Sequence, residues 1–189
     1  TVSFPNSTSR SANALLLEQV GANLDIVLGG TITVTNIGNT TCSTLPTDVA
    51  LTRLGPAGAV DSSFGSNGYA TVNVGVYAIC HPINGSSGCC YPSTDNCYSL
   101  ALESDGKILI GGNTDFAGAG APWFLVGRYS GNGVLDSAFG SYGLNVSNVG
   151  SAAYGVASGA DGKVVLAGTR APNLALARFT ATGVLDPPF

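Results

Sequence analysis

Short apolar runs recur along the chain, and each is bounded by residues that favour turns. Three of the runs share one pattern, in which aliphatic residues are followed by Gly-Gly or Ala-Gly: Ile26-Val-Leu-Gly-Gly30, Ile108-Leu-Ile-Gly-Gly112 and Val164-Val-Leu-Ala-Gly168. Short apolar runs between turn signals are typical of buried β-strands, whereas helices need longer periodic segments. The pattern therefore predicts an all-β chain built from short strands.

Two of these runs directly follow an Asp-Gly-Lys sequence, at Asp105–Lys107 and at Asp161–Lys163. Asp-Gly between apolar runs is a strong hairpin signal, because Gly tolerates the positive φ of a tight turn. Two hairpins are therefore expected, with these pairings: Ser99–Glu103 with Lys107–Gly111, and Tyr154–Ser158 with Lys163–Ala167.

A third strand is expected after each run, and in every copy it carries an arginine: Arg53, Arg128 and Arg178. Alternate residues of a strand share a face. Around Arg128 both faces are largely apolar, with Phe124 on one and Leu125 on the other. A sheet with one wet face would alternate apolar and polar residues instead. The strands therefore predict small sheets that are covered on both sides, as the blades of a propeller are.

A glycine-rich motif follows this strand in three copies, the last of them clipped: Gly58-Ala-Val-Asp-Ser-Ser-Phe-Gly65, Gly133-Val-Leu-Asp-Ser-Ala-Phe-Gly140 and Gly183-Val-Leu-Asp-Pro-Pro-Phe189. Such recurrence is the signature of a repeat protein. We expect one repeat domain over residues 1–189, divided as follows: repeat 1 at about 1–70, repeat 2 at about 71–144 with a cysteine-rich insertion at 77–98, and repeat 3 at about 145–189.

The hairpin, the arginine strand and the glycine-rich motif together resemble the delta-60 repeat, a family of secreted or surface-exposed prokaryotic proteins. The resemblance covers nearly the whole chain, although repeat 1 lacks Asp-Gly-Lys and repeat 2 has gained the insertion. It implies a β-propeller-like array of about three four-stranded blades, without a recognised catalytic residue. Since propellers close with about 4–8 blades, this array is incomplete as a ring unless further repeats or neighbouring chains complete it.

Composition narrows the classes of partner. Only 10% of the residues are charged and the formal net charge is −4, whereas a nucleic-acid surface would be a basic patch. No apolar run approaches the roughly 18 residues that a membrane helix needs. We therefore expect neither a nucleic-acid partner nor a membrane span.

The cysteines favour an oxidising compartment, because most of them fall within a short glycine- and serine-rich segment. Their spacing lacks the paired ligands of structural zinc sites. The disulfide candidates are Cys42, Cys80, Cys89, Cys90 and Cys97. Their odd number leaves one thiol free or bonded to another chain, and the pairing stays open. Weak glycosylation signals occur at Asn6, Asn39, Asn84 and Asn145. We expect a secreted protein, extracellular or on the cell surface.

Each repeat arginine has an aspartate on the far side of a glycine-containing turn: Arg53 with Asp61, Arg128 with Asp136, and Arg178 with Asp186. The two side chains can face each other across a hairpin, where an ion pair would fix the strand register. A repeated Ca²⁺ site is the less favoured interpretation, since each copy offers one carboxylate and Ca²⁺ takes about 6–8 oxygens.

The remaining charged residues are scattered, and His81 is the single histidine. General acid–base chemistry needs clustered titratable groups. We expect no catalytic residue, no metal site and no cofactor.

The leading hypothesis is a non-enzymatic extracellular structural protein that self-associates, as a homopolymer or homo-oligomer. The start of the chain, Thr1–Phe4, resembles Thr71–Val74, and the last motif stops at Phe189. We expect the first segment to be a strand that completes a neighbouring repeat, and head-to-tail contacts of this kind can build a filament or surface layer. The alternative is an adhesion module that recognises a cell-surface glycan or a protein through its insertion loops.

Overall fold

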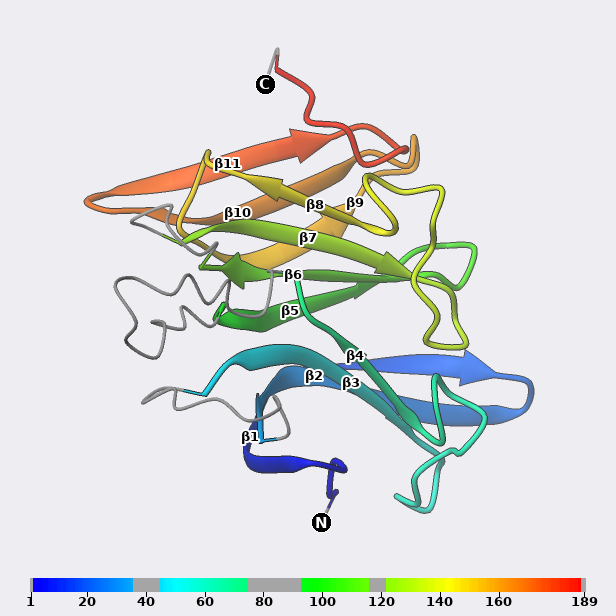
Figure 1. The fold of residues 1–189 in the computed structure, drawn as a ribbon. Helices are drawn as coiled ribbons and strands as arrows, with labels where there is room; N and C mark the ends of the chain where they lie inside the picture. The colour runs from blue at the N-terminus through cyan, green and yellow to red at the C-terminus, as the bar shows by residue number, and fades with distance from the viewer. Residues whose placement is uncertain (1, 36–44, 75–92, 116–121, 188–189) are drawn as a thin grey trace, which may run out of the picture.

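The structure of the chain, a computed structural model, describes residues 2–35, 45–74, 93–115 and 122–187 (Figure 1). All regular elements within these ranges are β-strands. The described residues contain no helix that is long and apolar enough to cross a membrane.

The strands form three antiparallel sheets stacked one on another, with the two chain termini at opposite ends of the stack (Figure 1). Sheet 1 has the order β1 (Ser7–Val20), β2 (Asn23–Val34), β3 (Thr47–Leu54) and β4 (Tyr69–Val72). Sheet 2 has the order β5 (Asp95–Leu102), β6 (Ile108–Thr114), β7 (Trp123–Tyr129) and β8 (Leu144–Ser147). Sheet 3 consists of β9 (Ala152–Ser158), β10 (Val164–Arg170) and β11 (Asn173–Phe179). The prediction of an all-β, unclosed, propeller-like array is confirmed, and each sheet is one blade.

The two hairpins predicted at Asp-Gly-Lys are present. Ser99 pairs with Gly111 in the second blade, and Ala157 pairs with Val165 in the third. The turn glycines Gly106 and Gly162 have φ values of 81° and 73°, the left-handed conformation that the Asp-Gly signal requires.

The blades are closest to one another at their first strands. β1 lies against β5, and β5 lies against β9, whereas β4 and β8 make their main contacts with the third strand of their own sheet. At the bulges of two first strands, Asn13 donates a hydrogen bond to the carbonyl oxygen of Cys97 at 2.8 Å. The ring of Tyr98 lies 5.2 Å from that of Tyr154. The array is therefore a fan that converges on its first strands.

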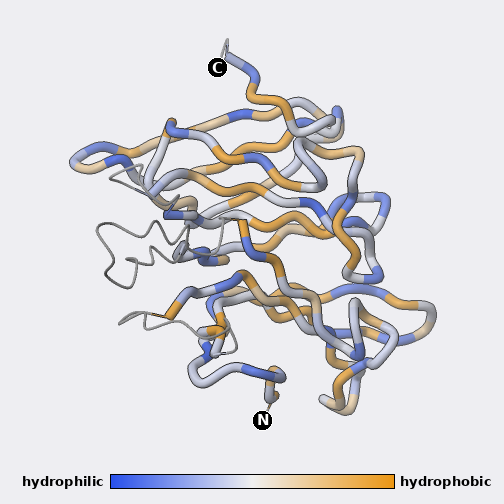
Figure 2. Tube along the Cα trace, in the orientation of Figure 1, coloured by the Kyte–Doolittle hydropathy of each residue, from blue (hydrophilic) through white to orange (hydrophobic). Residues whose placement is uncertain are grey.

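Two apolar cores fill the spaces between the blades. The first core lies between sheets 1 and 2, and its largest members include Leu51, Phe64, Ile110 and Leu125. The second lies between sheets 2 and 3 and includes the following buried residues: Leu109, Phe124, Val126, Phe139 and Leu166. The middle sheet is thus buried on both faces, as the sequence predicts for a blade. Figure 2 shows the apolar residues along the strands and polar residues at many of the turns.

Three details differ from the sequence-based expectations. β4 pairs with β3 of sheet 1, and β8 pairs with β7 of sheet 2. The first two blades therefore extend to Val72 and Ser147, a few residues beyond the expected repeat boundaries at about 70 and 144. Val2–Phe4 lie outside the strands, and the Phe4 ring packs against Tyr69 at 4.8 Å. β5 begins at Asp95, so the end of the expected insertion at 77–98 is a strand. Strand propensity and inward-facing apolar positions extend further toward the insertion than its composition suggests.

Candidate functional site

The glycine-rich motif forms a hairpin in each blade, and its arginine and aspartate meet across that hairpin. In the first blade, Asp61 donates its backbone N–H to the carbonyl oxygen of Arg53 at 2.9 Å, and the Arg53 guanidinium lies 2.8 Å from the Asp61 carboxylate. The corresponding ion-pair distances are 2.9 Å for Arg128 with Asp136 and 2.8 Å for Arg178 with Asp186. The structure brings together all three pairs that the sequence singles out.

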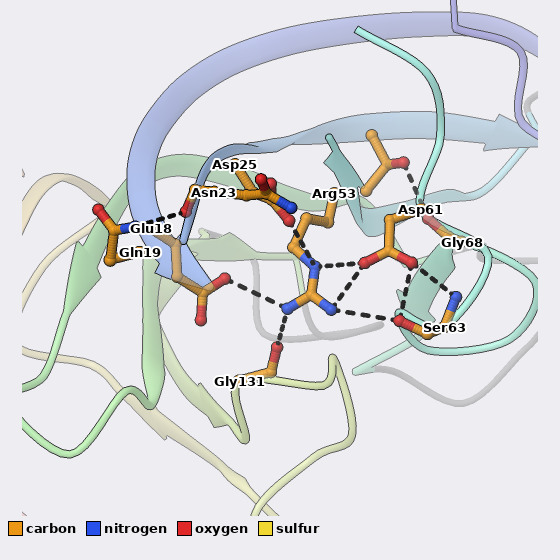
Figure 3. A network of polar contacts seen from close by, with 10 residues as sticks. Glu18, Gln19, Asn23, Asp25, Arg53, Asp61, Ser63, Gly68 and Gly131 are labelled. Atoms are coloured by element: carbon orange, nitrogen blue, oxygen red, sulfur yellow. Dashed lines mark hydrogen bonds and ion pairs between the residues drawn. The ribbon is translucent and has the colours of Figure 1, made fainter. Parts of the chain in front are cut away.

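The arginine also reaches the next blade, which the sequence does not indicate. Arg53, only 4% exposed, donates from Nη1 to the carbonyl oxygen of Gly131 at 2.7 Å (Figure 3). Gly131 belongs to the motif turn of the second blade. In the same way, Arg128 donates from Nη1 to the carbonyl oxygen of Ala181 at 2.9 Å, in the motif turn of the third blade. The arginine therefore joins its own aspartate to the backbone of the following blade.

The aromatic residue of the motif makes a second contact with the same turn. The guanidinium of Arg53 lies 5.2 Å from the ring centre of Phe64, and that ring packs against Gly133 of the second blade. A Cβ atom at Gly133 would lie 2.7 Å from Cε1 of Phe64. Arg128, Phe139 and Gly183 repeat the arrangement between the second and third blades, with 4.6 Å from the guanidinium to the ring centre.

A backbone hydrogen bond completes each contact. Gly65 donates its N–H to the carbonyl oxygen of Asn132 at 2.7 Å, and Gly140 donates to Thr182 at 2.8 Å. We call this set of contacts the blade junction: the arginine, aspartate and Phe-Gly of one blade, and the motif turn of the next. The motif is thus an element that docks one blade onto another.

Further carboxylates surround the arginines. Glu18 Oε2 lies 3.4 Å from Arg53 Nη1, and Asp25 Oδ2 lies 3.8 Å from Arg53 Nε (Figure 3). Glu103 is placed similarly, 3.8 Å from Arg128. The sequence suggested no pairing for these acids. A usable signal existed, because Glu18 and Glu103 both follow a leucine at the end of the first strand of their blades.

Burial and hydrogen bonding shift the carboxyl pKa values in opposite directions. Burial raises the pKa of Glu18 and of Glu103, and the nearby arginine opposes this effect only in part. Hydrogen bonds from Ser63 lower the pKa of Asp61, and a hydrogen bond from Lys163 lowers that of Asp186. Asp61 and Asp186, whose pKa values are lowered, are therefore the firmly ionised members of these networks.

The chemistry of the junction is that of binding. The guanidinium groups of Arg53 and Arg128 are held by carboxylates, a backbone carbonyl and an aromatic face, which are the partners that satisfy a buried cation. Among the described residues, no group of three or more His, Cys, Asp or Glu is arranged to hold a metal ion.

One disulfide candidate is corrected. Cys97 is a free thiol, fully buried in the first core, and burial raises its pKa to about 12. Its Sγ lies 3.6 Å from the carbonyl oxygen of Ser99. Because β5 begins before this residue, Cys97 points into the core as a small apolar side chain. The other four candidates, Cys42, Cys80, Cys89 and Cys90, lie outside the described residues.

The described glycosylation candidates differ in their surroundings. Asn6 is exposed, with a φ of 54°. Asn145 lies in β8 and donates from Nδ2 to the carbonyl oxygen of Gly183 at 2.8 Å. A glycan on that nitrogen would compete with a contact between the second and third blades. Asn39 and Asn84 lie outside the described residues.

A buried aspartate, Asp95, connects the first two blades at the end of the array opposite the blade junctions. Asp95, fully buried, accepts a hydrogen bond from the Val74 backbone N–H at 2.7 Å and another from the Thr114 hydroxyl at 2.6 Å. Val74 and Ser93 flank residues 75–92, and Ser93 accepts a backbone hydrogen bond from Thr47. Asp95, in β5, therefore links Val74, which precedes residues 75–92, to Thr114 of β6, a role that the sequence did not reveal.

Comparison with known proteins adds one match. A family model described as "Domain of unknown function (DUF5122) beta-propeller" matches residues 103–139 and 159–189. No curated protein matched the chain. Both matched segments begin at the hairpin before the second strand and extend into the glycine-rich motif. The repeats of the second and third blades are therefore similar to those of a β-propeller repeat family.

Proposed function

We propose that the chain is a non-enzymatic structural protein of the cell exterior that associates with copies of itself head to tail. The observation that carries this proposal is the outer face of sheet 3. On that face Leu174 is 89% exposed and Leu176 is 55% exposed. They occupy the positions that Phe124 and Val126 occupy in sheet 2, where both side chains are buried against sheet 3. An exposed apolar patch at a blade-stacking position favours a further blade as its partner.

The outer face of sheet 1 also carries exposed apolar side chains at a blade-stacking position. Leu15 is 64% exposed and Leu17 is 52% exposed, at the positions that Leu100 and Leu102 occupy on the face of sheet 2 that meets sheet 1. A groove of about 560 Å³ crosses this face, between the N-terminal segment and the sheet. The outer face of sheet 3 thus corresponds to the face of sheet 2 that packs on sheet 3, and the outer face of sheet 1 corresponds to the face of sheet 2 that packs on sheet 1.

The N-terminal segment fits the same arrangement. Phe4 packs on Tyr69, and Val74 lies beside Leu144, which holds the same place in the second blade as Tyr69 in the first. Val2–Phe4 therefore lie on the first blade where the end of a preceding fourth strand would lie. In a head-to-tail stack they would reach the β11 edge of a neighbouring copy and add a strand to it.

Two further considerations support the non-enzymatic and extracellular parts of the proposal. Three of the acidic residues, Glu18, Asp61 and Asp136, form ion pairs with the junction arginines, so these carboxylates contribute to the contacts between blades. The resemblance to the delta-60 repeat implies secretion or surface exposure. Fractionation of producing cells tests the location, and recovery of the chain only inside the cells would contradict it.

Measurement of particle mass by light scattering at several concentrations tests the association. The particles of the natural chain should have a mass above that of one chain. The double variant Leu174→Asp with Leu176→Asp should have the mass of a single chain. Val134→Asp is the control, because Val134 is 61% exposed but lies in a turn. A chain that stays monomeric at every concentration would refute the proposal. So would a double variant that associates as the natural chain does.

A second function, binding through the insertions, has one observation in its favour. The residues that flank segments 36–44, 75–92 and 116–121 all lie at the end of the array opposite the blade junctions (Figure 1). Insertions at one end of a repeat array often form its binding face. A glycan array probed with the chain, and with a variant lacking residues 77–92, tests this function. Identical signals from the two would count against it.

A further inference from the structure

We infer that the first blade junction is a proton-binding site, at which Glu18 carries a proton opposite Asp25, and that release of this proton as the pH rises loosens the contact between the first and second blades. The site lies within one chain, where sheets 1 and 2 meet (Figure 3). Two buried acids face each other there, and their charge exceeds that of the nearby arginine.

The two acids are fixed directly opposite each other on neighbouring strands. Glu18, near the end of β1, is the cross-strand partner of Asp25 in β2, and both side chains are more than nine-tenths buried. The turn between the strands is held by Gln19, whose amide donates to the carbonyl oxygens of Gly21 and Asn23. Like charges directly opposite each other destabilise a sheet, and burial adds to the cost of each charge. Two ionised carboxylates are therefore unfavourable at this position.

The positive charge at the site does not balance the acids. Arg53 is the buried cation, with Glu18 Oε2 3.4 Å from its Nη1 and Asp25 Oδ2 3.8 Å from its Nε. The same guanidinium also binds Asp61, which is partly exposed and lies 2.8 Å from Nη2. One proton on Glu18 leaves the three most buried groups of the site, one carboxyl, one carboxylate and one guanidinium, with no net charge.

The second blade faces this site with its backbone and with a balanced ion pair. Arg53 Nη1 donates to the carbonyl oxygen of Gly131 at 2.7 Å, and Gly131 lies beside Gly106 of the β5–β6 hairpin. Asp105 and Lys107, on either side of Gly106, form an ion pair with each other. Opposite charges at short range largely cancel at a distance. The negative charge around Glu18 therefore comes from sheet 1 and its motif hairpin.

An unsatisfied oxygen marks the same place. Asp25 Oδ1 is buried and accepts no hydrogen bond within the described part of the chain. A buried carboxylate oxygen without a donor is costly, so the site gains when it takes up a proton. Burial raises the pKa of Glu18, Arg53 opposes this effect, and the charges of Asp25 and Asp61 add to the rise. Glu18 is therefore the group that binds the proton.

The other two blades have a lysine where the first blade has Asp25. Each of these residues directly precedes the apolar run of the second strand, and the residue after it pairs with the residue after the junction arginine. Lys107 forms an ion pair with Asp105, and Lys163 forms one with Asp186. Asp25 thus replaces a cation of the repeat pattern by an anion, which distinguishes the first junction from the second.

Release of the proton acts on the bond between the blades. Arg53 Nη1 donates to Glu18 Oε2 and to the Gly131 carbonyl oxygen, so both oxygens converge on one nitrogen. An ionised Glu18 repels that carbonyl oxygen and draws the guanidinium toward β1, whereas the neutral acid does neither. A group with a raised folded-state pKa stabilises the fold at low pH, and this contribution is lost as the pH rises through that pKa. Asp61 stays ionised over the same range, because its pKa is lowered.

Hydrogen exchange of two backbone amides measures the loosening. Gly65 donates its N–H across the first junction and Gly140 donates across the second, so the two amides are matched reporters. Between pH 5 and pH 8 the protection factor of Gly65 relative to that of Gly140 should fall about threefold or more in the natural chain. The fall should be smaller in Asp25→Asn. A ratio that stays constant or rises in the natural chain would overturn the inferred loosening, and so would an equal fall in the variant.

A carbon-13 NMR titration of the Glu18 carboxyl group tests the proton site itself. In the natural chain the midpoint should lie above the ordinary value of 4.5, and a midpoint at or below that value would overturn the site. The midpoint should fall in Asp25→Asn, which keeps the shape and removes the charge, and fall further in Asp25→Lys, which restores the lysine of the other blades. Asp105→Asn, at an exposed carboxylate, is the control and should leave it unchanged. Equal midpoints in the natural chain and in both Asp25 variants would refute the role of the facing acid.

Discussion

A single methyl group added at Gly133 should loosen the contact between the first and second blades. The new Cβ atom in Gly133→Ala would lie 2.7 Å from Cε1 and 2.8 Å from Cζ of Phe64. That ring is fully buried and lies beneath the Arg53 guanidinium, so it has little room to move away. Gly106→Ala is the matched control, because its φ of 81° is close to the 75° of Gly133 and its Cβ would have no neighbour within 4 Å.

The expected magnitudes follow from this difference. An alanine in the left-handed conformation is strained by about 1–2 kcal/mol, and the loss of freedom in the unfolded chain offsets about 0.4–1 kcal/mol of that strain. Gly106→Ala should therefore lower the free energy of unfolding by about 0.5–1 kcal/mol. Overpacking of a buried contact adds about 1–3 kcal/mol, so Gly133→Ala should lower it by about 2–4 kcal/mol in total.

Urea unfolding, followed by the fluorescence of the single tryptophan, Trp123 at the start of β7, measures both values. A double-mutant cycle with Phe64→Leu isolates the contact, since the shortened side chain should relieve most of the extra loss at Gly133. If Gly133→Ala proves no more destabilising than Gly106→Ala, the blade junction does not stabilise the array in the way its geometry indicates. An unchanged cost of Gly133→Ala in the Phe64→Leu background would refute the role of the ring.

Three further outcomes are expected. Arg128→Lys should lower the free energy of unfolding by about 1–3 kcal/mol in a urea titration, because one buried charge-assisted bond to Asp136 or to the Ala181 carbonyl is lost; Arg170→Lys, at an exposed position, should change it by less than about 0.5 kcal/mol. Burial raises the folded-state pKa of Glu18, so the native state binds more protons than the unfolded state and stability falls as pH rises through that pKa; unfolding of Glu18→Gln at pH 4 and pH 7 should show a smaller fall than the natural chain, and an equal or larger fall would contradict this assignment. Burial and a pKa of about 12 should protect Cys97 from iodoacetamide at pH 8 until urea unfolds the chain, whereas peptide mapping that finds it alkylated in the folded protein would contradict its burial.

The parts of the fold that depend on near neighbours in sequence could be predicted. The hairpins at Asp-Gly-Lys and the pairing of Arg128 with Asp136 follow from turn chemistry and strand alternation over a few residues. The two-sided burial of the middle blade follows from the apolar residues on both faces of β6 and β7. Repetition strengthened each of these inferences, because a pattern that occurs in several copies is less subject to chance.

The contacts between blades could not be predicted, because they join residues far apart in the chain. The bond from Arg53 to the Gly131 carbonyl oxygen spans 78 positions and uses a backbone atom that any residue would supply. Cys97 was misassigned for a related reason. Its neighbours in sequence belong to a loop-like segment, and only its place in the first core, beside residues of another sheet, makes it a buried thiol. Sequence spacing carries little information about either kind of contact.

The blade junction also explains how so few charged residues can hold the array together. A buried guanidinium is tolerated only when its donors are satisfied, and the hairpin supplies Arg53 with a single aspartate. The shorter of its two Nη1 bonds, 2.7 Å to the Gly131 carbonyl oxygen against 3.4 Å to Glu18, is made to the turn of the following blade, so the arginine is fully accommodated only when that blade is in place. The stability of a repeat array is approximately the sum of the intrinsic stabilities of its repeats and of the interface energies between neighbouring repeats. The blade junction increases the share that comes from the interfaces. The stability of the third blade, whose arginine is the most exposed of the three, should therefore depend most on what covers its outer face.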